Sequence, residues 1–134
     1  MVNLSVELAG VTLKNPVIPA SGTFGYGREF AQVYDLDILG SFSFKGTTAQ
    51  PRFGNPQPRI AEAPGGMLNA VGLQNPGIDR VIEEELPSIA RLFHGPVIAN
   101  IGGNTVDEYA ENCRKLNGCE NVGLIEVNIS CPNV

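Results

Sequence analysis

Short apolar runs recur along the chain and are separated by loops and by stretches with helical spacing. Residues 4–8 alternate apolar and polar side chains, the chain turns at Ala9-Gly10, and the alternation resumes over 11–13. This pattern predicts a short hairpin. Nearly continuous apolar runs predict four buried strands further on. These strands are expected over residues 16–20, 38–44, 96–101 and 124–128.

The segments between these runs predict helices and one long loop. Residues 28–34 and 78–93 have helical spacing, and Pro87 predicts a break within the second. Thr105 and Glu108 form a capping box that opens a helix ending near residue 116. Residues 50–76 are rich in proline, glycine and asparagine, which predicts a long loop region.

Strands that alternate with helices indicate an α/β fold, either a doubly wound sheet or a (β/α)8 TIM barrel. A dinucleotide-binding sheet is expected to carry G-x-G-x-x-G after its first strand and an acid at the end of its second. The first loop lacks that spacing and the second strand ends in Lys45, so the barrel is favoured. Because a barrel needs ~250 residues, we expect residues 1–134 to form its N-terminal half, with four β/α units.

The composition excludes several classes of protein. The chain has 134 residues, of which 43% are hydrophobic, and a net charge of −5 with scattered basic residues, which disfavours a nucleic-acid surface. No apolar run reaches the ~20 residues of a membrane span, and the N-terminus lacks a signal peptide. Three cysteines without metal-binding spacing predict a reducing, cytoplasmic location and no metal site.

Polar groups or small residues follow each of the four predicted strands: Ala20-Ser21-Gly22, Lys45-Gly46-Thr47-Thr48, Asn100, and Asn128 with Cys131. This is the edge at which α/β barrels build active sites, although Asn and Ser also end strands by bonding their own backbone. Lys45 is placed to neutralise an anion that develops on a ligand. The alternative is a surface lysine with a buried stem.

Two further segments carry candidate chemistry. Ser130 and two asparagines flank Cys131, which favours an acid/base role over a structural thiol, whereas Cys113 and Cys119 are expected to be incidental. The glycine-rich segment 65–77 is either a solvent-facing turn or a backbone site for a carboxylate, with Asn69 bonding a ring amide. His94, at a helix end opposite the catalytic side, is expected to be structural.

Taken together, these motifs resemble one family, the FMN-containing catalytic subunits of class 1 dihydroorotate dehydrogenases. They stand in the family's order along the whole chain. The matching stretches are Asn15 to Gly22, Lys45-Gly46-Thr47-Thr48, Asn69 to Gly77, Ala99-Asn100-Ile101 and Asn128 to Asn133.

The resemblance implies a flavoprotein oxidoreductase that oxidises dihydroorotate to orotate in pyrimidine (UMP) biosynthesis. Cys131 would remove the C5 proton while hydride passes from C6 to the flavin, and Lys45 would stabilise the anionic reduced flavin. The residues implied to line FMN are Ala20, Ser21, Gly22, Lys45, Gly46, Asn100 and Asn128. Those implied to hold the substrate are Lys45, Asn69, Ala70, Val71, Gly72, Leu73, Asn128 and Asn133.

The sequences Lys45-Gly46-Thr47-Thr48 and Val71-Gly72-Leu73-Gln74 resemble those of the class 1B form. This form implies a homodimer and a partner subunit with FAD and an iron–sulfur cluster that passes electrons to NAD. Two alternatives stay open at this point. One is a dihydropyrimidine dehydrogenase-like enzyme acting on uracil, and the other is a non-catalytic half-barrel that associates through its open edges.

Overall fold

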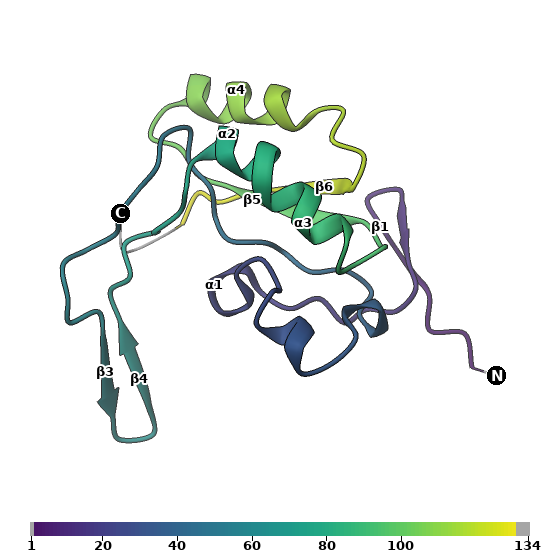
Figure 1. Cartoon of the computed structure of the whole chain (residues 1–134), viewed down its shortest axis with the longest axis horizontal. Helices are drawn as coiled ribbons and strands as arrows, with labels where there is room; N and C mark the ends of the chain where they lie inside the picture. The colour runs from purple at the N-terminus through teal and green to yellow at the C-terminus, as the bar shows by residue number, and fades with distance from the viewer. Residues whose placement is uncertain (1, 131–134) are drawn as a thin grey trace.

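The computed structural model describes residues 2–130, and its first element is the predicted hairpin (Figure 1). Strands β1 (Val6–Leu8) and β2 (Val11–Leu13) pair antiparallel. The two turn residues, Ala9 and Gly10, have φ values of 47° and 83°. Positive φ at both central residues is the geometry of a tight two-residue hairpin turn, so this prediction is confirmed.

The first predicted parallel strand, 16–20, is extended but forms no regular ladder. Its carbonyl groups are bonded, since Val17 O accepts from Gly40 N at 3.1 Å and Pro19 O from Ser43 N at 3.1 Å. Its two prolines have no N–H to donate, so they cannot contribute donors to a regular ladder.

The second predicted strand is displaced along the chain. Residues 36–38 form a 3₁₀ turn, η2 (Leu36–Ile38), rather than the start of a strand. The extended part runs from residue 41 to residue 47, beside strand β5 (Val97–Ile101). The prediction of a strand over 38–44 is therefore wrong at its start.

The pairing between this segment and β5 contains a bulge. Phe44 N donates to Ile98 O at 3.0 Å and Thr47 N donates to Asn100 O at 2.9 Å. Residues 44 to 47 on the first segment thus pair with residues 98 to 100 on β5, a spacing of three residues against two. The extra residue lies at Lys45-Gly46. Bulges of this kind redirect side chains at the ends of sheets.

Strand β6 (Val122–Val127) completes the array by pairing parallel to β5, with Asn100 opposite Glu126. The order of neighbours is 17–20, 41–47, β5, β6, which is the order of chain progression expected in a barrel. The expected α/β class is confirmed. Within residues 2–130 the array is open at both edges, so no closed barrel is present.

Helices α2, α3 and α4 lie together on one side of β5 and β6 (Figure 1). The helical elements not yet given are α1 (Ser21–Phe24), η1 (Phe30–Gln32), α2 (Ile78–Arg80), η3 (Val81–Glu85), α3 (Leu86–Ala90) and α4 (Val106–Leu116). The predicted break at Pro87 is present as the π-helical turn η3 just before it. A proline clashes with the carbonyl four residues earlier, and a wider turn relieves this.

The core lies between these helices and the parallel array. Phe42, Phe44, Val97, Ala99 and Ile101 are buried and pack on the helix side. The residues between them, such as Ser43 and Ile98, consequently point to the opposite, interior face. This alternation decides which side chains reach the candidate site.

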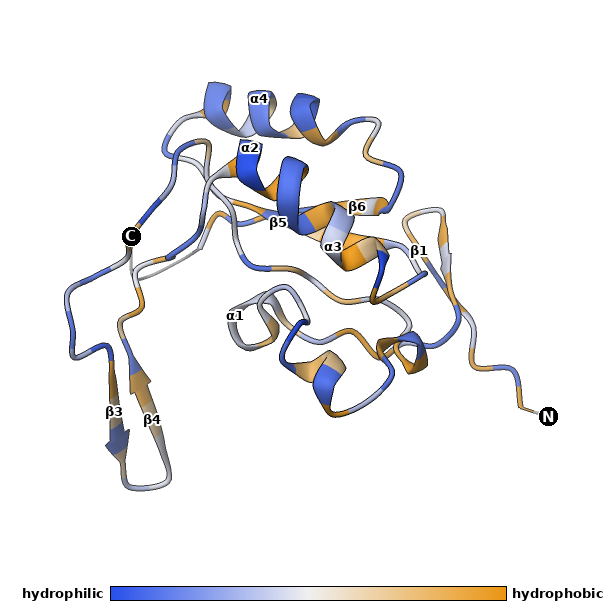
Figure 2. Cartoon of the chain, in the orientation of Figure 1, coloured by the Kyte–Doolittle hydropathy of each residue, from blue (hydrophilic) through white to orange (hydrophobic). Residues whose placement is uncertain are grey.

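The hairpin of β3 (Ile60–Ala63) and β4 (Gly66–Asn69) was missed by the sequence reading, which expected a loop. It stands apart from the core and carries apolar residues on exposed surface (Figures 1 and 2). Met67 and Leu68 are 64% and 66% exposed. Backbone pairing and the Pro64-Gly65 turn, rather than burial, define this hairpin.

Helix α4 begins as predicted. The Thr105 hydroxyl accepts from Glu108 N at 3.2 Å, while the Glu108 carboxylate accepts from Asn104 N at 2.7 Å. The second half of the capping box is thus displaced by one residue. No helix within residues 2–130 has the length and apolar character needed to cross a membrane.

His94 has the structural role expected of it, because it ties its loop to η2. The Asp37 carboxylate accepts from His94 N at 2.8 Å and contacts His94 Nδ1 at 2.6 Å. The backbone bond first, and then the ring, hold the pKa of Asp37 below its ordinary value of 3.8. A lowered pKa contributes stability that is present well above 3.8 and is lost as the pH falls through the folded-state pKa.

We therefore expect Asp37→Asn to lower the thermal midpoint at neutral pH and to differ less from the parent protein as the medium is acidified. Circular dichroism melts across the acid range measure this. The matched control is Glu7→Gln, which neutralises an exposed carboxylate on β1. A constant difference at every pH would contradict the role assigned to the Asp37 carboxylate.

Candidate functional site

Four of the predicted site residues meet at the C-terminal ends of the parallel segments. Asn100 Oδ1 accepts from Asn128 Nδ2 at 3.4 Å. A Cβ atom on Gly46 would lie 2.7 Å from that oxygen and 2.8 Å from Leu73 Cδ1. The contact leaves no room for a side chain at position 46, so two carboxamides, bare backbone and an apolar side chain share one small region.

Lys45 lies at the bulge beside this region. Its backbone N–H donates to Gly25 O at 2.9 Å, and its carbonyl accepts from Thr47 Oγ1 at 2.8 Å. Ser43 and Lys45 alternate with the buried Phe44, so Lys45 belongs to the interior face, where its residue is half-buried. This placement favours the predicted role at the strand mouth over that of a surface lysine.

Tyr26 lies behind this segment, with its ring tilted against Phe44 at 6.0 Å between centroids. Burial raises the pKa of its phenol to about 12, and Thr47 lowers it by a smaller amount. The two hydroxyls are close but are not in hydrogen-bonding geometry, and Tyr26 Oη has no partner among residues 2–130. The phenol is therefore neutral at physiological pH and is unsuited to proton transfer.

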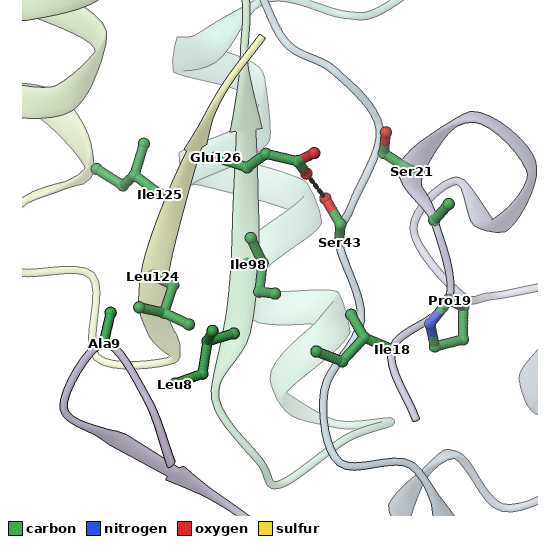
Figure 3. A pocket seen from close by; sticks show the side chains of 11 residues that line it. Leu8, Ala9, Ile18, Pro19, Ser21, Ser43, Ile98, Leu124, Ile125 and Glu126 are labelled. Carbon is green, nitrogen blue, oxygen red and sulfur yellow. Dashed lines mark hydrogen bonds between the residues drawn. The ribbon is translucent and has the colours of Figure 1, made fainter. Parts of the chain in front are cut away.

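A cavity of about 460 Å³ opens on the interior face of the array (Figure 3). Ala20 and Ser21 line this cavity, whereas Gly22 is exposed in the first turn of α1, and the flavin-lining role of all three stays a prediction. Within the cavity, Ser43 Oγ donates to Glu126 Oε2 at 2.5 Å. This pair was not predicted from the sequence. The one indication of it is that Glu126 is a single carboxylate inside an apolar strand.

The segment expected to hold the substrate follows β4. Asn69 is the last residue of that strand, and the backbone turns at Gly72 and Leu73, whose φ values are 76° and 55°. Asn69 and Ala70 are exposed, whereas Gly72 is buried. The left-handed conformation at both turn positions directs this segment back toward Gly46 and Asn100.

Asn75 joins this segment to the strand that carries Lys45. Its carboxamide oxygen accepts from Thr48 N at 3.1 Å and from Gly77 N at 2.9 Å. Its amide nitrogen donates to Thr48 Oγ1 at 3.0 Å and to Leu73 O at 2.9 Å. Asn75 is 5% exposed, so these bonds are shielded from water. The Lys45 segment and the substrate segment are held at a fixed separation.

Cys131 and Asn133 lie outside the described residues, so their predicted roles stay predictions. The other cysteines behave as expected of incidental thiols. Cys119 Sγ lies 3.8 Å from Lys115 O, and burial raises the pKa of its thiol, which disfavours the reactive thiolate. Residues 2–130 contain no cluster of three histidine, cysteine or acidic side chains that could hold a metal ion.

Comparison with known sequences identifies the family. The sequence model of the family described as "Dihydroorotate dehydrogenase" matches residues 3–134. The chain is 60% identical over 134 residues to "Dihydroorotate dehydrogenase B (NAD(+)), catalytic subunit" of Bacillus caldolyticus and to the protein of that name of Geobacillus kaustophilus. The match covers 100% of this chain and 42% of each relative.

Solved structures agree with the sequence matches. The dihydroorotate dehydrogenase of Eimeria tenella, crystallised in complex with ferulenol, superposes with a TM-score of 0.75 at 28% identity. That match covers 98% of this chain and 37% of the Eimeria tenella chain. The chain thus spans about two fifths of the length of the relatives it matches, and over that span it belongs to the dihydroorotate dehydrogenase family.

Proposed function

We propose that this chain contributes to a flavin-dependent enzyme that oxidises dihydroorotate to orotate in pyrimidine biosynthesis. Because the chain spans 42% of relatives such as the Bacillus caldolyticus protein, the activity is assigned to the (β/α)8 barrel of which residues 1–134 would form the N-terminal half. The observation that carries the proposal is the meeting of Gly46, Leu73, Asn100 and Asn128 beside Lys45.

The residues present fit an FMN ring. A flat heteroaromatic ring needs amide groups for its polar edge and small residues where it approaches the backbone. Asn100 and Asn128 supply the amides, and Gly46 supplies bare backbone whose missing Cβ would otherwise meet the Asn100 oxygen. Ala20 and Ser21, which line the interior cavity, support the assignment of that side to the cofactor.

FMN supplies the hydride acceptor when it is bound. In the proposed reaction Cys131 takes the proton from the substrate, and Lys45 offsets the negative charge that builds up at the strand mouth. Asn69, Asn128, Asn133 and the backbone of 70–73 orient the pyrimidine ring and its carboxylate.

The name of the Bacillus caldolyticus relative includes "catalytic subunit" and "NAD(+)". We extend this to the chain as a homodimer that works with a partner subunit, which holds FAD and an iron–sulfur cluster and delivers electrons to NAD. A cytoplasmic location is part of the same proposal. The free thiols of Cys113 and Cys119 are compatible with it.

An anaerobic visible spectrum of the full-length protein tests the proposal. We expect a flavin band that bleaches on addition of dihydroorotate and that persists with dihydrouracil. The Cys131→Ala variant is expected to keep the band but to bleach far more slowly near neutral pH, because it lacks the base. If only dihydrouracil bleaches the band, the substrate is dihydrouracil and not dihydroorotate. Absence of any flavin band would overturn the proposal.

A further inference from the structure

We infer that the loop 53–59 is a clamp that fixes the substrate segment, with Asn55 and Arg59 as positioning residues. The loop precedes the β3–β4 hairpin, and the substrate segment follows that hairpin, so the hairpin brings the two side by side. Neither residue is among those that the sequence reading assigned to the site. The inference rests on the proposed function, because it concerns the segment that would hold dihydroorotate.

Asn55 bonds the substrate segment through both the backbone and the side chain of Asn55. Asn55 N donates to Val71 O at 3.1 Å, and Asn55 Nδ2 donates to Ala70 O at 2.9 Å. Two successive carbonyl groups of the segment are thus bound to a single residue. An Ala at position 55 would keep the first bond and lose the second.

Arg59 bonds both to its own loop and to the substrate segment. Its Nε donates to Asn55 O at 2.5 Å and one terminal nitrogen donates to Phe53 O at 2.6 Å, which ties the loop to itself. The other terminal nitrogen donates to Gln74 Oε1 at 2.5 Å, and Arg59 O accepts from Ala70 N at 2.8 Å. Only a guanidinium has donors that diverge in this fixed way.

The two backbones approach so closely that side chains are excluded between them. A Cβ on Gly72 would lie 2.7 Å from Asn55 N, and one on Gly54 would lie 2.4 Å from Val71 O. Both glycines also have positive φ, of 76° and 78°. The clamp therefore determines the path of residues 70–74 through polar bonds and through shape.

A residue that fixes the binding segment without touching the reacting atoms affects affinity more than chemistry. In the full-length protein, stopped-flow reduction against dihydroorotate concentration separates the dissociation constant from the limiting rate of flavin reduction. We expect Asn55→Ala to raise the dissociation constant about fivefold and Arg59→Ala about tenfold or more, since each lost bond is worth roughly a factor of five. The limiting rate and flavin content are expected to stay within about twofold of the parent values.

Two matched variants and one independent readout complete the test. Asn104→Ala and Arg114→Ala remove the same residue types at exposed positions, where within residues 2–130 Asn104 bonds Glu108 and Arg114 bonds Glu111 of the same helix. Both are expected to bind dihydroorotate like the parent. Arg59→Lys is expected to recover less than half of the lost affinity, and hydrogen exchange in peptides covering 70–74 is expected to accelerate in both clamp variants.

The possible failures are distinguishable. If the parent protein binds dihydroorotate and both clamp variants bind it equally well, the clamp is overturned while the proposed function stands. A fall in limiting rate with unchanged affinity overturns it in the same way. If the parent protein binds neither dihydroorotate nor orotate, the proposed function fails and the substrate role of the clamp fails with it.

Discussion

A Lys45→Ala variant of the full-length protein is expected to reduce its flavin about 10²- to 10³-fold more slowly with dihydroorotate, the cost typical of removing one preorganised charge-stabilising donor. Lys45 is half-buried at a bulge on the interior face, beside Gly46 and Asn100. Its position is set by backbone bonds to Gly25 and from Thr47. A cation held in place before the reaction stabilises developing negative charge without reorganisation. Single-turnover bleaching of the flavin measures the effect.

The control for this variant is Lys14→Ala, which removes an exposed lysine next to β2. It is expected to reduce its flavin at the parent rate. Lys45→Arg keeps the charge but not the shape, and is expected to recover only part of the rate. A Lys45→Ala protein that holds flavin and bleaches within about threefold of the parent would remove Lys45 from the chemistry.

Gly40→Ala is expected to be the most destabilising small substitution in the described part of the chain. A Cβ at this position would lie 1.8 Å from Asn15 O, which is a backbone atom and cannot rotate away. The two crossing segments are bonded at the same point, since Gly40 N donates to Val17 O at 3.1 Å. Separating them breaks the edge of the parallel array. We expect a loss of about 4 kcal/mol, or a thermal midpoint lower by roughly 10 °C.

Gly66→Ala is the matched control, because a Cβ there meets no atom within 4 Å. Position 66 lies in the exposed strand β4, so alanine is expected to change the midpoint by less than about 2 °C. Thermal melts of the two variants beside the parent protein measure the difference. Equal midpoints for Gly40→Ala and the parent would show that residues 15 and 40 separate freely.

The order of the parallel segments was predictable because apolar runs mark the strands and a barrel places successive strands side by side. β5 is an apolar run broken only by Asn100, and it was predicted over 96–101. The strand expected over 124–128 begins two residues earlier, as β6, and none of the β6 residues is buried, so the expectation of a buried strand there is wrong. The first two strands were harder to bound. Prolines remove donors from 16–20, and the bulge at Lys45-Gly46 interrupts the regular pairing of 41–47 with β5. The prolines are visible in the sequence, whereas the bulge depends on the pairing with β5, which the local sequence does not reveal.

The hairpin β3–β4 was missed for a different reason. All four residues of β4 are exposed, so no alternation of buried and exposed positions marks the strand. The usual signal of a half-buried strand is therefore absent. The dipeptide Pro64-Gly65 was the one local indication of a turn.

The site was predictable where residues end strands, and less so elsewhere. Asn100 and Asn128 were expected together and lie together. Glu126, Asn55 and Arg59 were not expected. Glu126 is hidden within an apolar run, and the two clamp residues lie in a segment whose partner is brought near only by the hairpin.

The saturated carboxamide of Asn75 has a consequence for engineering this scaffold. It bonds Thr48 on one strand and Leu73 and Gly77 on the other segment, so neither segment keeps its geometry alone. If the substrate loop is transplanted from a relative, both junctions must lie outside residues 45–77. Only then does the loop come with the segment that carries Lys45. A chimera joined between Thr48 and Asn75 would take the two bonded segments from different proteins. The two segments should therefore be exchanged between relatives together.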